Sequence, residues 1–419
     1  MTDLTLPMPL GAAPTFAVDD DVTRGGDFAD TQPSHIAVRG LPIAFTGSGS
    51  EYFRIWIVNL LLTLVTLGIY YPWAKVRRLR YFHGNTLVGG EPLGFHADPK
   101  KMLKGYLLVS ALLALYSVAG HFSAVAGAIA FIAVMLIWPA LLKSSMQFRL
   151  ANTSWRGLRF RFTGDLRGAY AAMIPLFVPA LCLVVSLAFV PNQEQPPMWY
   201  IYATMGVMAG LLLLSPWLFQ RLKAYQHNHY ALGAQHTQFS AGVGSFYKLF
   251  GKVVVVYLGI SALLGILVTV VILLVVFVGG ASGNPFAQGA NNKPVWLIAA
   301  AMFGFAALML LFVSMIKPYV ATRMQNLVWT NTQSEDIRFH SRLKARAMMW
   351  LSAKNWLLVV ITLGLYWPFA AIARARMQLE AVSIASQISL DSLVNRTRNH
   401  EGEAAGDAAG DLFGLDIGF

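Results

Sequence analysis

Residues 253–279 read VVVVYLGISALLGILVTVVILLVVFVG, a run that contains no charged side chain. A helix needs about 20 apolar residues to span the hydrocarbon of a bilayer. A membrane β-barrel would instead show segments of about 10 residues in which apolar and polar side chains alternate. This run does not alternate, and a backbone within lipid must satisfy its own hydrogen bonds. The stretch therefore predicts a transmembrane helix.

Similar apolar runs recur along the 419 residues, of which 56% are hydrophobic and 12% charged. Soluble domains carry about 25% charged residues, so this composition excludes an ordinary soluble protein. Trp and Tyr flank many of the runs, as in the aromatic belts of membrane proteins. We predict an all-α polytopic membrane protein of about eight apolar helical segments with short cytoplasmic β-strand elements. The segments lie near 52–73, 104–121, 123–142, 169–190, 198–219, 252–279, 295–317 and 350–370.

The basic residues gather in every second connection. Of the 32 Lys and Arg, 28 lie in residues 75–104, 143–168, 219–252, 317–354 and 371–398. The positive-inside rule places these connections in the cytoplasm. The net charge of +12 therefore indicates contact with anionic lipid head groups rather than with nucleic acid. Acidic, flexible tails are expected at 1–38 and 399–419, on either side of one membrane domain at 39–398.

An internal repeat organises this membrane domain. Three prolines, each near the end of a helix that returns to the cytoplasmic side, are followed thirteen residues later by Asn-Thr. The prolines are Pro72, Pro139 and Pro318, and the asparagines are Asn85, Asn152 and Asn331. Residues 39–47, RGLPIAFTG, also match 156–164, RGLRFRFTG, at six of nine positions. We predict that the three asparagines are turn residues and that a short strand follows each turn.

The strands would gather in a small cytoplasmic layer, because a lone strand is not stable. Their basic side chains would face lipid head groups or water. The residues predicted to contact head groups are Arg159, Arg161, Arg342 and Arg346.

The first and last copies of the repeat contain one apolar segment each instead of two. Asn59-x6-Thr66-Leu67-Gly68-x-Tyr70-x-Pro72 matches Asn355-x6-Thr362-Leu363-Gly364-x-Tyr366-x-Pro368. In one interpretation each segment crosses the membrane once, since it holds enough apolar residues to do so. In the other, each is a re-entrant hairpin that turns at Thr-Leu-Gly, which keeps every strand on the cytoplasmic side. The sequence leaves both alternatives open.

The block FTGSGSEYFRIWIVNLLLTLVTLGIYYPWAKVRRLRYFHGNTLVGGEPLGF at residues 45–95 resembles the YjgN-like family of bacterial inner-membrane proteins, whose function is unknown. The resemblance covers about residues 39–398. It implies a multi-pass protein of the inner membrane, and it implies no activity, substrate or cofactor.

The sequence favours no catalytic chemistry. No Asp, Glu, Lys or Arg lies inside an apolar run except near its ends, which argues against a proton-driven pump. No Gly-x4-Gly-Lys-Ser/Thr loop is present, and no Ser-His-Asp or Cys-His arrangement has plausible spacing. His227, His229 and His236 lie close together in sequence, but two of them fall on repeat positions. We expect no enzyme activity, no cofactor and no metal site.

Two hypotheses remain. The first is a transporter or channel-like protein with a pathway between the first and last repeat units, because interrupted helices at corresponding repeat positions point to such sites. The predicted lining residues are Asn59, Thr66, Gly68, Asn355, Thr362 and Gly364. The second is a non-transporting scaffold that binds lipid or a protein partner of unknown identity. For Asn59 and Asn355, which lie within apolar runs, an interhelical hydrogen bond that fixes packing is favoured over a role in lining a pathway.

Overall fold

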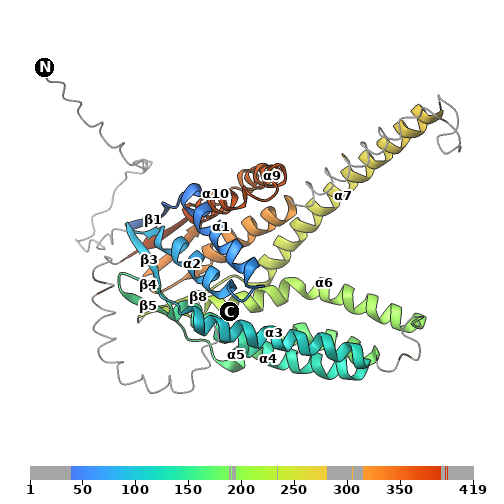
Figure 1. The fold of residues 1–419 in the computed structure, drawn as a ribbon, viewed down its shortest axis with the longest axis horizontal. Coiled ribbons are helices and arrows are strands. Elements are labelled where there is room, and N and C mark those ends of the chain that lie inside the picture. Colours follow the sequence, from blue (N-terminus) through green and yellow to red (C-terminus); the bar gives the residue numbers. More distant parts are fainter. Residues whose placement is uncertain are drawn as a thin grey trace, which may run out of the picture. The chain divides into compact units, whose positions relative to one another are not determined.

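The computed structural model describes residues 39–187, 190, 195–233, 235–280, 304, 315–387, 392 and 394, and it combines long helices with an 11-stranded antiparallel sheet (Figure 1). The helices are α1 (Gly49–Val65), α2 (Tyr71–Gly84), α3 (Pro99–Phe122), α4 (Ala124–Ala151), α5 (Leu166–Leu187), α6 (Met198–His227), α7 (Val243–Gly280), α9 (Ala345–Ile361) and α10 (Trp367–Glu380). Residues 315–330 are also helical. The predicted tails 1–38 and 399–419 lie outside the described residues.

The strands are short, with two to seven residues each. They are β1 (Arg39–Phe45), β2 (Thr86–Val88), β3 (Glu91–Phe95), β4 (Thr153–Trp155), β5 (Leu158–Phe162), β6 (Tyr230–Leu232), β7 (Gln235–His236), β8 (Gln238–Phe239), β9 (Thr332–Gln333), β10 (Ile337–Ser341) and β11 (Val382–Ser386).

The sheet closes on itself into a ring. Its strand order is β7-β6-β5-β4-β3-β2-β1-β11-β10-β9-β8, and the two end strands, β7 and β8, are separated in the chain by Thr237 alone. β1 joins the two halves of the chain, because Arg39 pairs with Ser386 and Phe45 pairs with Thr86. β1, β3 and β5 each pair with one neighbour along their first half and with the other along their second half. Such a stagger is what closes a sheet into a ring.

The helices that the structure describes all leave the ring from the same edge. The last residue of a strand that leads into a helix pairs each time with the first residue of a strand that follows a helix. The pairs are Phe45–Thr86, Phe95–Thr153, Phe162–Tyr230, Phe239–Thr332 and Ser341–Val382. Because entry and exit points adjoin at each pair, the ring lies at one end of the helices. The strands gather as predicted, but the sheet that they form is larger than the expected small layer. The predicted all-α fold class therefore leaves out a substantial β component.

Among the described residues, five helices are long and apolar enough to cross a membrane: Pro99–Phe122, Val125–Ala151, Leu166–Val184, Met198–His227 and Val243–Val270. They coincide with the segments predicted near 104–121, 123–142, 169–190, 198–219 and 252–279. Exposed aliphatic side chains such as Leu115, Leu212 and Val255 follow these helices, as expected of surfaces that face lipid. Most of the segment predicted at 295–317 lies outside the described residues.

The two remaining segments, 52–73 and 350–370, are helical hairpins and not single crossings. α1 ends at Val65 and α2 begins at Tyr71, while α9 ends at Ile361 and α10 begins at Trp367. β1 and β2, which flank the first hairpin, pair with each other, so the chain returns to the edge that it left. Of the two alternatives left open by the sequence, the structure has the hairpin.

Leucine and glycine with positive φ make each hairpin turn. Leu67 and Leu363 have φ of 49° and 50°, and the following Gly68 and Gly364 have φ of 91° and 93°. Backbone with φ near 90° suits glycine, which has no Cβ to collide with its own backbone. Both leucines are 94% exposed at the hairpin tips, although L-residues rarely adopt this conformation.

Candidate functional site

The three predicted turn asparagines end helices in the same way. Nδ2 of Asn85, Asn152 and Asn331 donates to the carbonyl oxygen four residues earlier, at 2.8, 2.8 and 2.7 Å. The carbonyls of Tyr81 and Phe148 also accept from the backbone amides of Asn85 and Asn152, so these two asparagines close the last turn of their helices with two hydrogen bonds each. His229, which takes the equivalent place after α6, bonds the carbonyl of Tyr225 through Nδ1 at 2.7 Å.

The backbone carbonyls at these turns also join neighbouring units of the ring. The carbonyls of Asn85, Asn152, His229, Asn331 and Ala381 accept hydrogen bonds from the residues that follow the adjoining strands, at 2.8–2.9 Å. The donors, given in the same order as the carbonyls, are the backbone amides of Thr46, His96, Thr163, Ser240 and Arg342. The turns therefore fix the edge of the ring from which the helices leave.

The ring and the helix ends at this edge surround a cavity of about 930 Å³, which is in the range of small-molecule sites in proteins. Its wall is built mainly from apolar side chains on alternate strand residues, since alternate residues of a strand share a face. The strand residues include Leu41, Ile43, Val88, Leu93, Trp155, Phe160, Leu232, Phe339 and Ile384. The helix ends add Phe82, His83, Leu150, His227, Met324, Val328, Trp329 and Leu379.

Polar groups in the wall are mostly satisfied within the protein. Thr332, which is 1% exposed, shares a 3.0 Å hydrogen bond with Nδ1 of His227 and donates to the carbonyl of Val328 at 2.8 Å. Lys223 donates from Nζ to Gln226 Oε1 at 2.9 Å. A buried group whose hydrogen bonds are already made offers little to a polar ligand. The wall thus favours an apolar occupant.

Outside the candidate membrane spans, two titratable groups of the wall, His83 and Tyr230, have pKa values that disfavour charge. Burial lowers the pKa of His83, with a further lowering by the positive charge of Arg149, against a hydrogen bond to the Leu79 carbonyl that raises it. Burial raises the pKa of Tyr230 to about 12, although Arg149 opposes the shift. Both shifts have the direction that a site with little water produces.

The residues predicted to line a pathway instead contact their own hairpins. Oδ1 of Asn59 accepts from Arg77 at 3.3 Å, and Nδ2 of the buried Asn355 donates to the Ala370 carbonyl at 3.5 Å. Oγ1 of Thr66 and of Thr362 each donates to a carbonyl of the preceding turn at 2.7 Å. Gly68 and Gly364 form the turns themselves. These contacts stabilise the two hairpins, and the pathway stays a prediction.

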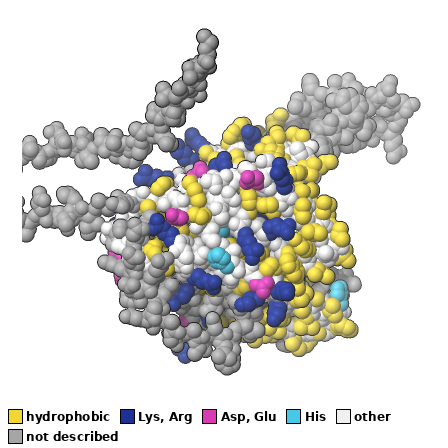
Figure 2. Space-filling view, turned by 60° about the vertical axis from the view of Figure 1, so that its left-hand side comes forward, with side chains coloured by type: hydrophobic (Ala, Val, Ile, Leu, Met, Phe, Trp, Pro, Cys, Tyr) yellow, Lys and Arg dark blue, Asp and Glu magenta, His cyan; other side chains and the backbone are white. Residues whose placement is uncertain are grey.

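The predicted head-group arginines lie on the outer surface. Arg159 and Arg161 are exposed on β5, where they alternate with inward-facing Leu158, Phe160 and Phe162. Arg342 follows β10 and Arg346 lies in the first turn of α9, and both are exposed. Figure 2 shows Lys and Arg side chains spread over the end that carries the strands, with hydrophobic side chains beside them. Their contact with lipid head groups stays a prediction.

Sequence reasoning missed the cavity. The side chains two residues before the five turn positions all line it: His83, Leu150, His227, Trp329 and Leu379. That shared spacing was a signal, but apolar side chains at such positions are equally typical of a solid core. Within the described ranges, no group of three His, Cys, Asp or Glu side chains could hold a metal ion.

A comparison with protein families decides the identity of the chain. The sequence profile of a family described as "Bacterial protein of unknown function (DUF898)" matches residues 40–412. The chain belongs to the DUF898 family. No solved structure matches it.

Relatives of this DUF898 chain are described as inner-membrane proteins. Inner membrane protein YjgN of Salmonella typhimurium is 25% identical over 339 residues, which cover 79% of this chain and 85% of that protein. Inner membrane protein YjgN of Escherichia coli O157:H7 is 28% identical over 153 residues, which cover 36% of each chain. With its five candidate spans, the chain is a multi-pass protein of the bacterial inner membrane in contact with the lipid bilayer.

Proposed function

We propose that the chain binds the apolar part of a membrane lipid within the ring of strands and that it is a lipid-binding protein of the inner membrane rather than an enzyme. The observation that carries this proposal is the cavity of about 930 Å³ with its apolar wall. Burial of an apolar chain is favourable by about 0.8 kcal/mol for each methylene group.

The location of the ring supports a lipid as the occupant. The described helices all leave the ring from one edge, and the basic connections of the sequence lie at that end, which supports a ring at the cytoplasmic surface of the membrane. Bilayer lipids are the most abundant apolar molecules within reach of such a cavity. The arginines predicted to contact head groups, Arg159, Arg161, Arg342 and Arg346, would hold the ring against anionic lipids, at about 1 kcal/mol for each Lys or Arg near the surface.

Of the two hypotheses drawn from the sequence, these contacts favour lipid binding over transport of a solute. The polar groups expected to line a solute pathway, on Asn59, Thr66, Asn355 and Thr362, make hydrogen bonds within their own hairpins. A polar solute would need free donors and acceptors along its path.

We also propose that the ring arose from copies of one unit, each consisting of two helices and two strands. The equivalent carbonyl bonds at the five turn positions support this origin. So does the matched geometry of Leu67-Gly68 and Leu363-Gly364. The first and last units would then be shortened copies that turn back before crossing.

The test is binding of a neutral, environment-sensitive fluorophore to the full-length chain purified in mild detergent. Leu232→Trp places a larger side chain into the cavity from β6. The matched control is Gln238→Trp, since Gln238 is exposed on β8 and does not line the cavity. We expect saturable binding that falls at least tenfold in Leu232→Trp and stays unchanged in Gln238→Trp.

Photocrosslinking with a lipid that carries a diazirine at its chain end gives a second readout. Adducts should map to lining residues such as Val88 and Phe160 in addition to the lipid-facing helices. If the wild-type chain shows neither saturable binding nor adducts inside the ring, the proposed function is wrong.

A further inference from the structure

A second, smaller pocket adjoins the cavity within the ring. It has a volume of about 230 Å³ and is lined by α2 and α10, which are the second helices of the two hairpins. Phe82, Ala375 and Gln378 line both this pocket and the large cavity, so the two spaces share a wall. A molecule with two parts of different chemistry could therefore occupy both.

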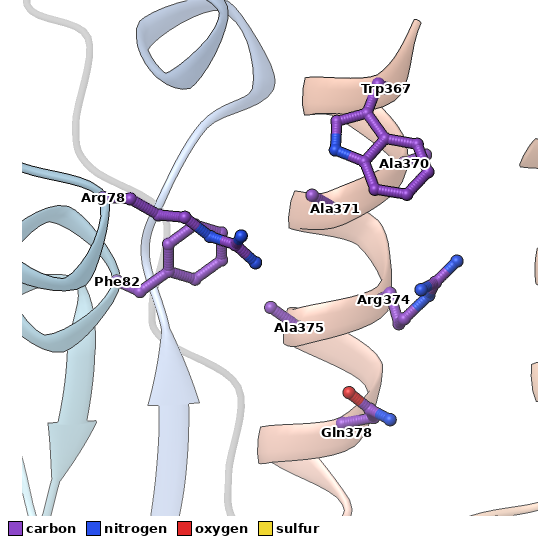
Figure 3. A pocket seen from close by; sticks show the side chains of 8 residues that line it. All are labelled: Arg78, Phe82, Trp367, Ala370, Ala371, Arg374, Ala375 and Gln378. Carbon is purple, nitrogen blue, oxygen red and sulfur yellow. The ribbon is translucent and has the colours of Figure 1, made fainter. Parts of the chain in front are cut away.

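The small pocket combines positive charge with an apolar floor. In Figure 3, Arg78 and Phe82 extend from α2 toward the face of α10 that carries Ala371 and Ala375. Arg374 leaves α10 on the flank away from Arg78 in this view, and both arginines line the pocket.

The two arginines are available for a ligand. Neither Arg78 nor Arg374 makes a hydrogen bond or ion pair with the described part of the chain, and the Arg78 guanidinium lies 5.7 Å from the centre of the Phe82 ring. By contrast, their neighbours on the same helices are engaged, because Arg77 bonds Asn59 and Arg376 bonds the Gly47 carbonyl.

The surrounding charge favours an anion. α2 contains four basic residues and no acidic one, and in α10 Glu380 is the single carboxylate, at the last position. A planar guanidinium donates two parallel hydrogen bonds to phosphate oxygens, which makes arginine well suited to phosphate groups. Trp367, at the first position of α10, is a residue type that membrane proteins place at head-group level.

We propose that this pocket binds the phosphate of an anionic phospholipid whose acyl chain enters the cavity within the ring. The proposal rests on the proposed function for the chain, and it adds the class of ligand and the residues that select it. Arg78 and Arg374 hold the phosphate, and the acyl chain passes the wall formed by Phe82 and Ala375 into the cavity.

The experiment measures two affinities for each variant of the full-length chain in detergent. One is for phosphatidylglycerol and the other is for the neutral fluorophore, with phosphatidylcholine as the zwitterionic comparison. The double variant Arg78→Gln/Arg374→Gln should bind phosphatidylglycerol more weakly by about tenfold or more for each arginine, from the usual strength of hydrogen bonds to charged groups. It should bind the fluorophore as the wild type does.

Arg338→Gln/Lys344→Gln is the matched control, since it removes the same charge from exposed positions outside both pockets. It should leave both affinities unchanged. Equal binding of phosphatidylglycerol by wild type and Arg78→Gln/Arg374→Gln, with fluorophore binding intact, overturns the head-group site and leaves the proposed function standing. So does an equal loss in the control variant, which would indicate attraction by net charge alone. Failure of the wild type to bind the fluorophore overturns the proposed function itself.

Discussion

The turn at Gly364 offers a test in which the sign of the result distinguishes a hairpin from a continuous crossing. In the structure Gly364 has a φ of 93°, and a Cβ built on it would have no heavy atom within 4 Å. Gly364→Ala therefore creates no clash, and its whole cost is conformational. The left-handed region costs an L-residue roughly 1–2 kcal/mol relative to the right-handed one.

A continuous helix through this position would give the opposite result. Alanine in a helix is more stable than glycine by about 0.8–1.0 kcal/mol. Gly84→Ala is a matched control within the protein. Gly84 is helical at the end of α2 and exposed, and a Cβ built on it would have no heavy atom of a neighbouring residue within 4 Å. We therefore expect Gly364→Ala to lower the free energy of unfolding by about 1–2 kcal/mol and Gly84→Ala to leave it unchanged or raise it.

The assay is a denaturant titration of the purified chain in detergent micelles, followed by far-ultraviolet circular dichroism. Gly364→Asn should lose less stability than Gly364→Ala, because asparagine tolerates the left-handed region better. Gly68→Ala, at the matching turn with a φ of 91°, should reproduce the loss. An unfolding free energy of Gly364→Ala equal to or above that of the wild type would refute the hairpin reasoning.

Three further predictions concern the turns and the wall of the cavity. Asn152→Ala removes the bond from Nδ2 to the Phe148 carbonyl and should cost about 0.5–1.5 kcal/mol in the same titration, whereas Asn152→His, which mimics the unit after α6, should retain part of it. Thr332→Val leaves Nδ1 of His227 without its partner and should cost about 1–3 kcal/mol, and Thr332→Ser should restore most of that loss. His83 has a lowered pKa in the folded chain, so the unfolded chain takes up its proton first, and stability should fall as the pH drops below about 6.5, the usual pKa of histidine. His83→Leu should weaken that dependence when unfolding is measured at successive pH values between 7.5 and 5, and an unchanged slope would contradict the assigned burial.

Much of the architecture could be predicted from the sequence because its signals are local. A run such as 253–279 indicates a membrane helix by itself, and the spacing from proline to Asn-Thr marks where a returning helix ends. The positions of Asn85, Asn152 and Asn331 at helix ends follow from that spacing. The choice between hairpin and crossing at Thr66-Leu67-Gly68 did not follow, since an apolar segment of this length is compatible with both.

The closed ring and its cavity could not be predicted in the same way. The strands are too short for their pairing partners to be read from periodicity, and the contact that completes the ring joins Arg39 to Ser386. The alternation Leu158-Arg159-Phe160-Arg161-Phe162 shows correctly which side chains point inward. It does not show that the inward side chains of the ring leave space at the centre, because the same pattern occurs when they fill it.

The pairing of the first strand with the last has a consequence for biosynthesis. When β1 emerges from the ribosome, it can pair along Ile43–Phe45 with β2, but its other half must wait until β11 has been translated more than three hundred residues later. Throughout that interval the nascent chain carries open strand edges, which are prone to pair with other molecules. Insertion of the helices one pair at a time would hold the growing arc of strands at the bilayer surface. A prematurely terminated product that lacks β11 would keep its exposed edges, which makes it a natural substrate for quality-control proteolysis.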